Sequence, residues 1–305
     1  MKCLVTGGAG FIGSHLIERL LNEGHTAIII DDLSSGNENN LVFNGHKHPI
    51  IRTSIRDANI DSYFKDIDIV FHLAALTRPQ WSIAHPCASN MINVDGMLSV
   101  LQASINNNVK RFIFASSASV YGEQKIFPSA ETYPPNPISP YGLQKLIGEQ
   151  YCKLYSQIYN LKFNALRFFN VYGPRMNPNS EYAGAISLFV KALVHGKSPD
   201  IFGDGEQARD FVYISDVIDA VMLATTSETV NEVFNIGSGY NISINRVYET
   251  IKTILNSDII ANHIAPKIEP RITLANYNKA KFLLDWNPKV NFLQGINQYL
   301  EVTKW

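Results

Sequence analysis

Short runs of apolar residues alternate along this chain with segments whose apolar residues recur every three or four positions. Residues 3–5 form such a run, and Phe11, Leu16 and Leu20 then mark a segment with helical spacing, so we expect a strand followed by a helix. The alternation continues, with strands expected at residues 27–30, 50–51, 68–75 and 111–115, and helices at residues 90–108 and from residue 141. This order is typical of an α/β protein with a doubly wound parallel sheet.

Size and composition limit the class of protein. The 305 residues have room for one large α/β domain or for a large and a small one. A net charge of −1 gives no reason to expect a nucleic acid or a membrane surface as partner. Cys3, Cys87 and Cys152 are scattered, the N-terminus enters a strand directly, and no apolar run approaches the roughly 18 residues of a membrane span. We therefore expect a reducing, cytoplasmic location.

The turn between the first strand and the first helix is rich in glycine. Gly8, Gly10 and Gly13 fit G-x-G-x-x-G, and Gly7, Gly10 and Gly13 give the three-residue spacing of a related nucleotide-binding turn. Without Cβ atoms the backbone can approach a pyrophosphate, whose charge suits the free N–H groups of a helix N-terminus. With the flanking strand and helix, this spacing predicts a Rossmann dinucleotide-binding fold.

Asp31 follows the second expected strand, 18 positions after Gly13. An acidic residue there bonds the adenosine ribose hydroxyls of NAD and repels the 2′-phosphate of NADP. No Arg or Lys occurs between Asp31 and Phe43, so we expect NAD as the cofactor. The alternative is that Asp31 is only a turn residue.

A candidate catalytic site begins where the strand at residues 111–115 ends, at Ser116 and Ser117. Tyr141 and Lys145 open a later helix, and their i, i+4 spacing puts both side chains on one face of it. A free Tyr titrates near 10 and is a poor base at neutral pH, but a neighbouring cation favours its phenolate. Ser116 and Ser117 could exchange roles as the hydroxyl that bonds the reacting oxygen.

His72 is a titratable residue to which we assign no chemistry. It lies inside a strand that is expected to be buried, where a side chain points away from substrate. A core histidine with satisfied hydrogen bonds is the simpler interpretation.

Several segments together resemble one known family. The chain is similar along nearly its whole length to extended short-chain dehydrogenases/reductases of the nucleotide-sugar epimerase/dehydratase group. The resemblance lies in Thr6-Gly7-Gly8-Ala9-Gly10-Phe11-Ile12-Gly13, His72-Leu73-Ala74-Ala75, Ser116-Ser117-Ala118-Ser119-Val120-Tyr121-Gly122, Tyr141 with Lys145, Arg167-Phe168-Phe169-Asn170-Val171-Tyr172-Gly173-Pro174-Arg175, and Phe202-Gly203-Asp204-Gly205-Glu206-Gln207-Ala208-Arg209-Asp210-Phe211. It implies a Rossmann NAD-binding domain over residues 1–175, to which later segments can return, and a smaller C-terminal α/β domain over residues 176–305, which mainly binds the nucleotide sugar.

The resemblance also implies which residues bind ligands. Asn170 and Arg209 contact the diphosphate of the substrate, and Phe202 lies along its base. Arg209 suits a phosphate as a bidentate fork, while an ion pair with Asp204 or Asp210 is the alternative. The cofactor positions are Gly7, Gly10, Phe11, Ile12, Gly13, Asp31, Asp32, Ser35, Gly36, Ser54, Ile55, Leu73, Ala74, Ala75, Asn93, Tyr141, Lys145 and Phe168. No metal is expected.

The residues after the serine pair narrow the reaction. Most relatives begin with hydride transfer from a sugar carbon to NAD, and related dehydratases and decarboxylases place an acid one or two positions after the catalytic Ser or Thr. This chain has Ala118 and Ser119 there. We therefore expect the 4-keto sugar to rotate and take the hydride back on its other face, which is 4-epimerisation. Tyr141 is expected to act as base and then acid, Ser117 to bond the reacting oxygen, and Lys145 to lower the pKa of Tyr141.

Two other functions stay open. A nucleotide-sugar 4-ketoreductase, or another sugar-modifying oxidoreductase, would bind NADPH loosely and consume it, which Asp31 without a nearby base disfavours. A non-catalytic NAD-sensing protein would have no use for the pair of Tyr141 and Lys145.

The expected substrate is a UDP-hexose. Thr273 aligns with a position that resembles a gate, at which a bulky aromatic residue excludes 2-acetamido sugars. Because Thr273 is small, we expect UDP-N-acetylglucosamine to be accepted as well as UDP-glucose. Uronic-acid epimerases are a weaker match, because Gln80 stands where their pattern often has Arg.

The chain departs from the family pattern at three places. Ser54 stands where an Asp often bonds the adenine amino group. The usual R-P-G-D run, whose Arg holds a phosphate, is replaced around residues 266–271, so Lys267 and Arg271 are the candidates for that role. Asn276 replaces an acid before the last helices and is expected to cap a helix.

Family members commonly dimerise through a four-helix bundle. The two helices involved correspond to residues 90–108 and to the helix that opens at Tyr141. Leu146, Ile147, Tyr151 and Leu154 fit such a bundle, although the same stripe could face only the sheet. We expect a homodimer.

Overall fold

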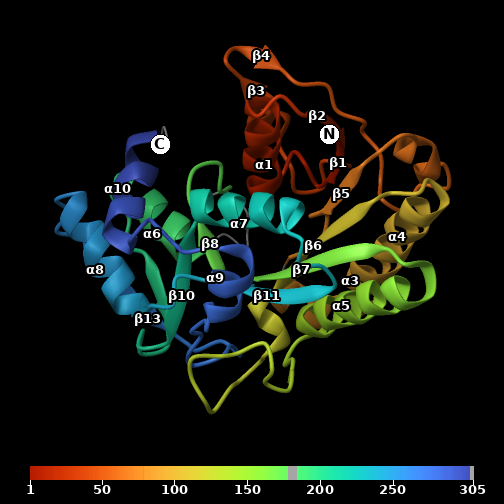
Figure 1. Ribbon diagram of the computed structural model, residues 1–305. Coiled ribbons are helices and arrows are strands. Elements are labelled where there is room, and N and C mark those ends of the chain that lie inside the picture. The colour runs from red at the N-terminus through yellow and green to blue at the C-terminus, as the bar shows by residue number, and fades with distance from the viewer. Residues whose placement is uncertain (78, 178–183, 303–305) are drawn as a thin grey trace.

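A computed structural model describes residues 1–77, 79–177 and 184–302 of the chain. At its centre lies a six-stranded parallel sheet in the order β11-β7-β6-β5-β1-β2 (Figure 1). Its strands are β1 (Lys2–Thr6), β2 (Thr26–Ile30), β5 (Ile69–His72), β6 (Arg111–Ser117), β7 (Lys162–Phe168) and β11 (Glu232–Ile236). The expected α/β fold with a parallel sheet is confirmed.

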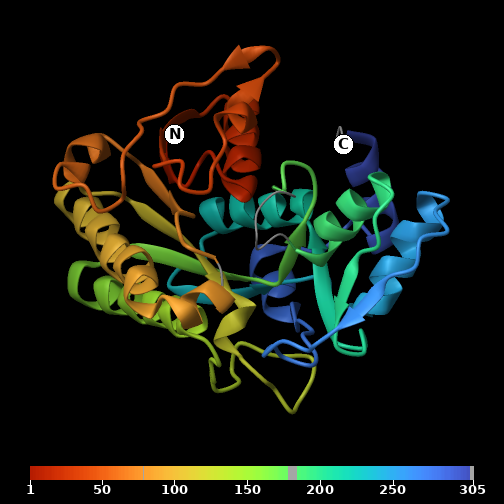
Figure 2. The same ribbon diagram turned by 180° about the vertical axis from the view of Figure 1, so that it is seen from behind.

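Helices cover both faces of this sheet (Figures 1 and 2). On one face α1 (Phe11–Asn22) packs against β1 and β2, and α7 (Ile214–Thr226) packs against β6 and β7. On the other face α4 (Met97–Asn106) and α5 (Pro140–Tyr159) pack together against the middle strands. Neighbouring strand residues enter different cores, since Val5 joins the core under α1 and α7 and Leu4 joins the core under α4 and α5. Burial on both faces therefore explains why the strands are continuous apolar runs.

Three boundaries differ from the sequence-based prediction. The helical region expected at residues 90–108 begins earlier, as α3 (Pro86–Asn90), and passes through a π-helical turn, η3 (Met91–Gly96), into α4. Residues 50–51 form a single bridge, between Ile51 and Ile30, in place of a strand. β5 ends at His72, so Leu73 to Ala75 lie beyond the strand. The other short elements of this half are η1 (Glu38–Leu41), β3 (Val42–Phe43), β4 (His46–Lys47), η2 (Ile60–Phe64), α2 (Pro79–Ala84) and η4 (Ala118–Val120).

A smaller group of elements begins where the central sheet ends. One residue after β7, β8 (Asn170–Tyr172) starts a second sheet with β10 (Ala208–Tyr213) and β12 (Asn241–Ser243). Beside it, β9 (Asp200–Phe202) pairs with β13 (Asn262–Ile264). The helices of this group are α6 (Ala185–Val194), α8 (Ile244–Ile254) and α10 (Phe292–Val302), while α9 (Asn278–Leu284) packs on α7 and β11.

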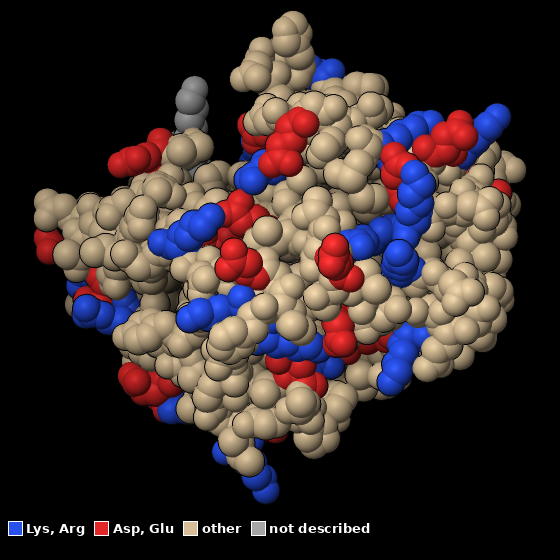
Figure 3. All heavy atoms as spheres, in the orientation of Figure 1, with Lys and Arg blue, Asp and Glu red and all other residues tan. Residues whose placement is uncertain are grey.

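The surface carries both kinds of charge. On the face in Figure 3, Lys and Arg side chains stand among Asp and Glu side chains, in keeping with the net charge of −1. Within the described ranges, every helix is too short or too polar to cross a membrane.

Candidate active site

The glycine turn after β1 is closely packed. Gly7 has φ +72°, and a Cβ on it would lie 2.7 Å from the backbone nitrogen of Ala74. A Cβ on Gly13 would lie 2.2 Å from the carbonyl oxygen of Gly7. Both positions therefore require glycine. The first turn of α1 contains no acidic residue, so its free N–H groups can receive an anion.

A cavity, called the first chamber below, runs along the carboxyl ends of β1, β2, β5 and β6. Its lining includes most of the expected cofactor positions: Gly7, Gly10, Phe11, Ile12, Gly13, Asp31, Asp32, Ser35, Ile55, Leu73, Ala74, Ala75, Tyr141, Lys145 and Phe168. Ligands of open α/β sheets bind at this edge. The chamber thus combines an anion site at α1 with the Asp31 carboxylate beside the glycine turn, which fits a dinucleotide.

Three expected cofactor positions lie outside this lining, and their contacts stay predictions. Gly36 packs against Asp31, because a Cβ on it would meet Asp31 Oδ1 at 2.9 Å. Ser54 Oγ accepts from the backbone nitrogen of Arg56 at 3.2 Å. Asn93 Oδ1 accepts from the backbone nitrogen of Leu76 at 2.7 Å, and thereby holds the segment after β5.

The lining also contains residues that the motifs did not single out. Thr53, next to the expected Ser54, lines the first chamber. Thr77 lines this chamber and the next one. A lone Thr belongs to no motif, so the sequence could have indicated Thr77 as a site residue only by its position shortly after the end of β5.

Asp31 lines the first chamber and also accepts a hydrogen bond from the backbone of the glycine turn. Its carboxylate accepts from the backbone nitrogen of Ala9 at 2.9 Å and from that of Leu33 at 2.8 Å. A carboxylate has about four acceptor positions, so two stay available to ribose hydroxyls. Burial raises the pKa of Asp31, while these hydrogen bonds work in the opposite direction.

Ser117, Tyr141 and Lys145 come together at the end of β6 and the start of α5. Ser139 caps α5 by accepting from the backbone nitrogen of Gly142 at 3.1 Å, and Ser82 accepts from that of Tyr141 at 3.1 Å. These two bonds fix the first turn of α5, from which Tyr141 and Lys145 reach the first chamber.

Burial dominates the titration of this group. It raises the pKa of Tyr141 to about 12, and a hydrogen bond with Ser117 offsets only part of the rise. It lowers the pKa of Lys145 to about 7, against the charge of Glu149. Lys145 Nζ donates to the carbonyl of Ala115 at 2.7 Å and lies 5.9 Å from the centre of the Tyr141 ring. The net shift of the Tyr141 pKa is upward, opposite to the direction expected from its Lys145 neighbour, because desolvation outweighs the hydrogen bond with Ser117.

The two serines at the end of β6 differ in their partners. Ser116 donates to Glu149, which also forms a buried ion pair with Arg167 at 2.7 Å. Ser117 bonds Ser119 and lines both chambers. Both serines line the first chamber, but the hydroxyl of Ser116 is engaged by Glu149, and only Ser117 of the two also lines the second chamber.

His72 is a buried core residue, as expected. It is 2% exposed, its Nδ1 lies 2.9 Å from the hydroxyl of Thr6, and its ring stacks on Phe114. Burial lowers its pKa to about 3. The imidazole is therefore neutral at ordinary pH.

A second chamber adjoins the first and shares Thr77, Ser117, Phe168, Phe169 and Val171 with it. Its lining includes every expected substrate position: Ser117, Asn170, Phe202, Arg209 and Thr273. The hydroxyl of Thr273 accepts from the backbone nitrogen of Asp210 at 3.2 Å and from Asn170 Nδ2 at 3.3 Å. Ser117 thus stands at the border between the two chambers.

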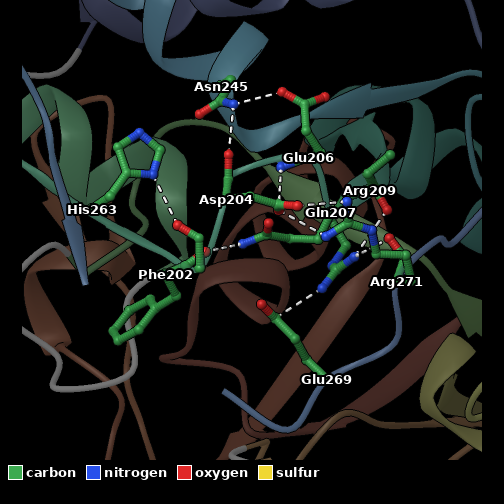
Figure 4. A network of polar contacts seen from close by, with 11 residues as sticks. Phe202, Asp204, Glu206, Gln207, Arg209, Asn245, His263, Glu269 and Arg271 are labelled. Atoms are coloured by element: carbon green, nitrogen blue, oxygen red, sulfur yellow. Dashed lines mark hydrogen bonds and ion pairs between the residues drawn. The ribbon is translucent and has the colours of Figure 1, made fainter. Parts of the chain in front are cut away.

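Arg209 forms an ion pair with neither Asp204 nor Asp210, the two partners considered from the sequence. It pairs with Glu269 at 2.8 Å, whereas Asp204 pairs with Arg271 at 2.7 Å (Figure 4). Asp210 instead accepts from backbone N–H groups, including that of Ala275 at 2.9 Å. The alternative of an Asp partner is therefore wrong. Of the two candidate cations after residue 265, Lys267 lines the second chamber, whereas Arg271 is tied to Asp204 outside the lining.

Asn276 lies just before α9. Its side chain accepts from the backbone nitrogen of Asn278 at 3.1 Å, at the first residue of that helix. This bond satisfies an otherwise free N–H group, but the N-cap of α9 is Tyr277, so Asn276 lies one residue before the capping position that was expected of it.

Comparison with known protein families agrees with the dinucleotide site and the Ser117, Tyr141 and Lys145 group described above. Residues 3–237 match the NAD dependent epimerase/dehydratase family. The chain belongs to this family. A UDP-glucose 4-epimerase of Mycolicibacterium smegmatis is 34% identical over 307 aligned residues, which cover 99% of this chain and 98% of that protein.

Solved structures of epimerases resemble the whole chain. UDP-glucose 4-epimerase of Thermotoga maritima, with UDP-glucose, is 39% identical with a TM-score of 0.95, covering 99% of this chain and 98% of that one. UDP-N-acetylglucosamine 4-epimerase of Methanobrevibacter ruminantium, in complex with UDP-N-acetylmuramic acid, is 38% identical with a TM-score of 0.94, covering 98% of this chain and 97% of that one. At these identities the likeness extends beyond the fold to the class of nucleotide-sugar epimerase.

Proposed function

We propose that this chain is an NAD-dependent 4-epimerase of UDP-hexoses. The observation that carries the proposal is the position of Ser117, which borders both chambers and stands beside Tyr141 and Lys145. No carboxylate follows it at Ala118 or Ser119 to support elimination. The family match and the whole-length epimerase relatives support the same reaction.

NAD fits the first chamber. The N-terminus of α1 and the glycine turn hold its pyrophosphate, and Asp31 accepts from its adenosine ribose. When bound, NAD supplies the acceptor for a hydride, and its positive ring favours a nearby phenolate. Lys145, fixed to the carbonyl of Ala115 by one N–H group, can donate its remaining N–H groups to a ribose.

The chain supplies the proton transfer. Tyr141 takes the proton from the sugar 4-hydroxyl as the 4-keto sugar forms, and returns it after the sugar has turned. Ser117 donates a hydrogen bond to the sugar 4-oxygen, both while it is a hydroxyl and after it has become the ketone oxygen. Because burial favours the neutral form of Tyr141, the residue retains the proton while the ketone is present and has it available to return.

The second chamber takes the UDP-sugar. Arg209 and Asn170 contact the diphosphate, and Phe202 lies along the uracil. Thr273 is small, so the chamber accepts UDP-N-acetylglucosamine as well as UDP-glucose. Two relatives support this range, because one is named for each sugar.

Two features of the whole molecule belong to the same proposal. The NAD-binding domain comprises residues 1–175 with α7 and β11, and the rest of residues 176–305 binds the nucleotide sugar. The dimer forms through α4 and α5. Of the expected stripe, Leu154 is exposed, whereas Leu146 and Tyr151 pack against the core; Leu143 and Ile158 are also exposed on α5 and extend the apolar side. The cytoplasmic location stays a prediction.

The proposal is tested by NMR of the anomeric signals. The purified protein is incubated, without added reductant, with UDP-glucose and separately with UDP-N-acetylglucosamine. We expect the galacto epimer of each to appear with no net change in cofactor. Consumption of NADPH with a reduced product would instead favour a ketoreductase, and no change in either sugar would contradict the substrate class.

A further inference from the structure

Arg209 is incompletely satisfied in the second chamber. The residue is 8% exposed, and its Nη1 donates to the carbonyl of Ala208 at 2.9 Å. Its Nη2 lies 2.8 Å from Glu269 Oε2, yet no acceptor in the described part of the chain meets it with hydrogen-bond geometry. The pair with Glu269 is therefore held by charge, and the N–H groups of Nη2 stay available to a better placed acceptor.

Glu269 belongs to a segment, residues 267–270, that lines the second chamber and is called the strap below. Lys267 Nζ lies 3.3 Å from the centre of the Phe202 ring, so the strap contacts a second expected nucleotide residue. The carbonyl of Ile268 accepts from Gln80 Nε2, on α2, at 2.8 Å. The strap thus places the Glu269 carboxylate against Arg209 of β10 (Figure 4). It also places the Lys267 ammonium group against Phe202 and bonds α2 through Gln80.

We propose that Glu269 is an internal counter-ion, which occupies the place of the substrate diphosphate at Arg209 and must be displaced for a nucleotide to bind. This inference rests on the proposed UDP-sugar site. A buried guanidinium without a counter-charge is costly, so Glu269 stabilises the protein before substrate arrives. A diphosphate offers more charge and several acceptor oxygens, which can meet both free N–H groups of Nη2 with the geometry that Glu269 lacks.

Displacement of Glu269 is feasible because its side chain is 36% exposed. A carboxylate that already contacts water regains hydration with little rearrangement. The cost of its release is nevertheless subtracted from every phosphate contact with Arg209. Glu269 therefore lowers the affinity for phosphate-bearing nucleotides and leaves a nucleoside without phosphate unaffected.

The variant E269Q separates this role from others. It keeps the shape of the side chain and removes the charge, and E206Q is the matched control. Glu206 lies in the same network, bonds Asn245, and is absent from the second chamber (Figure 4). Dissociation constants for UDP and for uridine are measured by calorimetry on the purified, NAD-containing protein.

We expect E269Q to bind UDP about tenfold more tightly than the unaltered protein, the size of one charged hydrogen bond, with uridine binding changed less than about twofold. UDP binding by E269Q should also weaken more steeply with salt, because the site gains net positive charge. Unchanged or weaker UDP binding by E269Q overturns the proposal, and so does an equal gain in E206Q, which would indicate a general effect of charge. If UDP binds none of the three proteins, the nucleotide itself is wrong and the proposed function fails with it.

Discussion

Ser116 donates a hydrogen bond of 2.5 Å from its Oγ to Glu149 Oε1, which ties the end of β6 to the helix that carries Tyr141 and Lys145. Glu149 also receives two bonds from Arg167 on β7, at 2.8 and 2.7 Å. One buried carboxylate thus joins two strands to α5 directly behind the reacting groups. Its loss should affect the stability of this region first.

The variant E149A tests this junction. Removing one partner of a buried ion pair leaves the other charge uncompensated, so we expect the free energy of unfolding in urea to fall by about 3 kcal/mol or more. The control E249A removes an exposed carboxylate from α8 and should change it by less than about 0.5 kcal/mol. Equal effects of the two variants would show that the ion pair of Glu149 and Arg167 makes no net contribution to the free energy of unfolding.

Replacement of Tyr141 by Phe should abolish epimerisation and leave bound NAD in place. Loss of a general acid and base costs about 100- to 10,000-fold in rate. The control Y155F makes the same change on the side of α5 that faces α4, where the hydroxyl lies 3.5 Å from Gln102. Turnover is followed by NMR and NAD by its absorbance after denaturation. Normal turnover in Y141F would refute the assigned mechanism.

Buried His72 should make the protein sensitive to acid. Its pKa is about 3 in the folded protein against 6.5 in a free side chain, so below pH 6.5 the unfolded chain binds a proton that the folded chain does not. The free energy of unfolding therefore falls as the pH falls, by up to about 1.4 kcal/mol per pH unit from this residue. His15, whose pKa is lowered to about 4 by burial, adds to the same trend.

The variant H72N measures the share of His72, because Asn can still bond Thr6 but does not titrate in this range. Urea unfolding at pH 7 and pH 4.5 should show a smaller difference in H72N than in the unaltered protein. H46N, at an exposed histidine on β4, should leave the difference unchanged. A full acid sensitivity in H72N would assign the effect to other groups.

Thr273 should set the range of sugars. T273Y places an aromatic ring in the second chamber, so we expect the rate with UDP-N-acetylglucosamine to fall at least about tenfold relative to UDP-glucose. T273S keeps a hydroxyl for the backbone nitrogen of Asp210 and should keep the ratio of the two rates. Because T273Y also removes that acceptor, the ratio and not either rate alone is the readout. An unchanged ratio would place the sugar's acetamido group elsewhere.

A charge on the outer side of α5 should separate the proposed dimer. Ile158 is 57% exposed, and I158E would place a carboxylate within the apolar stripe that includes Leu154. We expect I158E to elute as a monomer in size-exclusion chromatography at micromolar concentration. I260E, at an exposed position beyond α8, is the control. A dimeric I158E would move the interface to another surface.

The sequence predicted the central sheet well, because apolar runs such as residues 69–72 and 111–115 are buried on both faces and leave an unambiguous pattern. Boundaries were predicted less well, since the helical region before α4 begins at Pro86 among polar residues that have no apolar period. The glycine turn and the pair of Tyr141 and Lys145 were found from local spacing together with the strands and helices expected around them.

Contacts between distant parts of the chain were not predictable from spacing. The partner of Arg209 is a carboxylate 60 positions later, although Asp204 and Asp210 stand much nearer in sequence. Likewise, the direction of the Tyr141 pKa shift depends on burial by several elements, which the i, i+4 relation to Lys145 does not contain.

The strand order of the central sheet also determines which parts of the domain can pair and pack while the chain is still being synthesised. β11 borders β7 at one edge of the sheet but follows it by more than sixty residues, and α7, which covers β6 and β7, is made only shortly before. A nascent chain that has reached residue 175 therefore holds every catalytic side chain but leaves the β7 edge unpaired and one face of β6 and β7 uncovered. The catalytic side chains are therefore synthesised before the elements that cover the strands carrying them. The stability of the catalytic centre depends on α7 and β11, although neither element contributes a group to the chemistry.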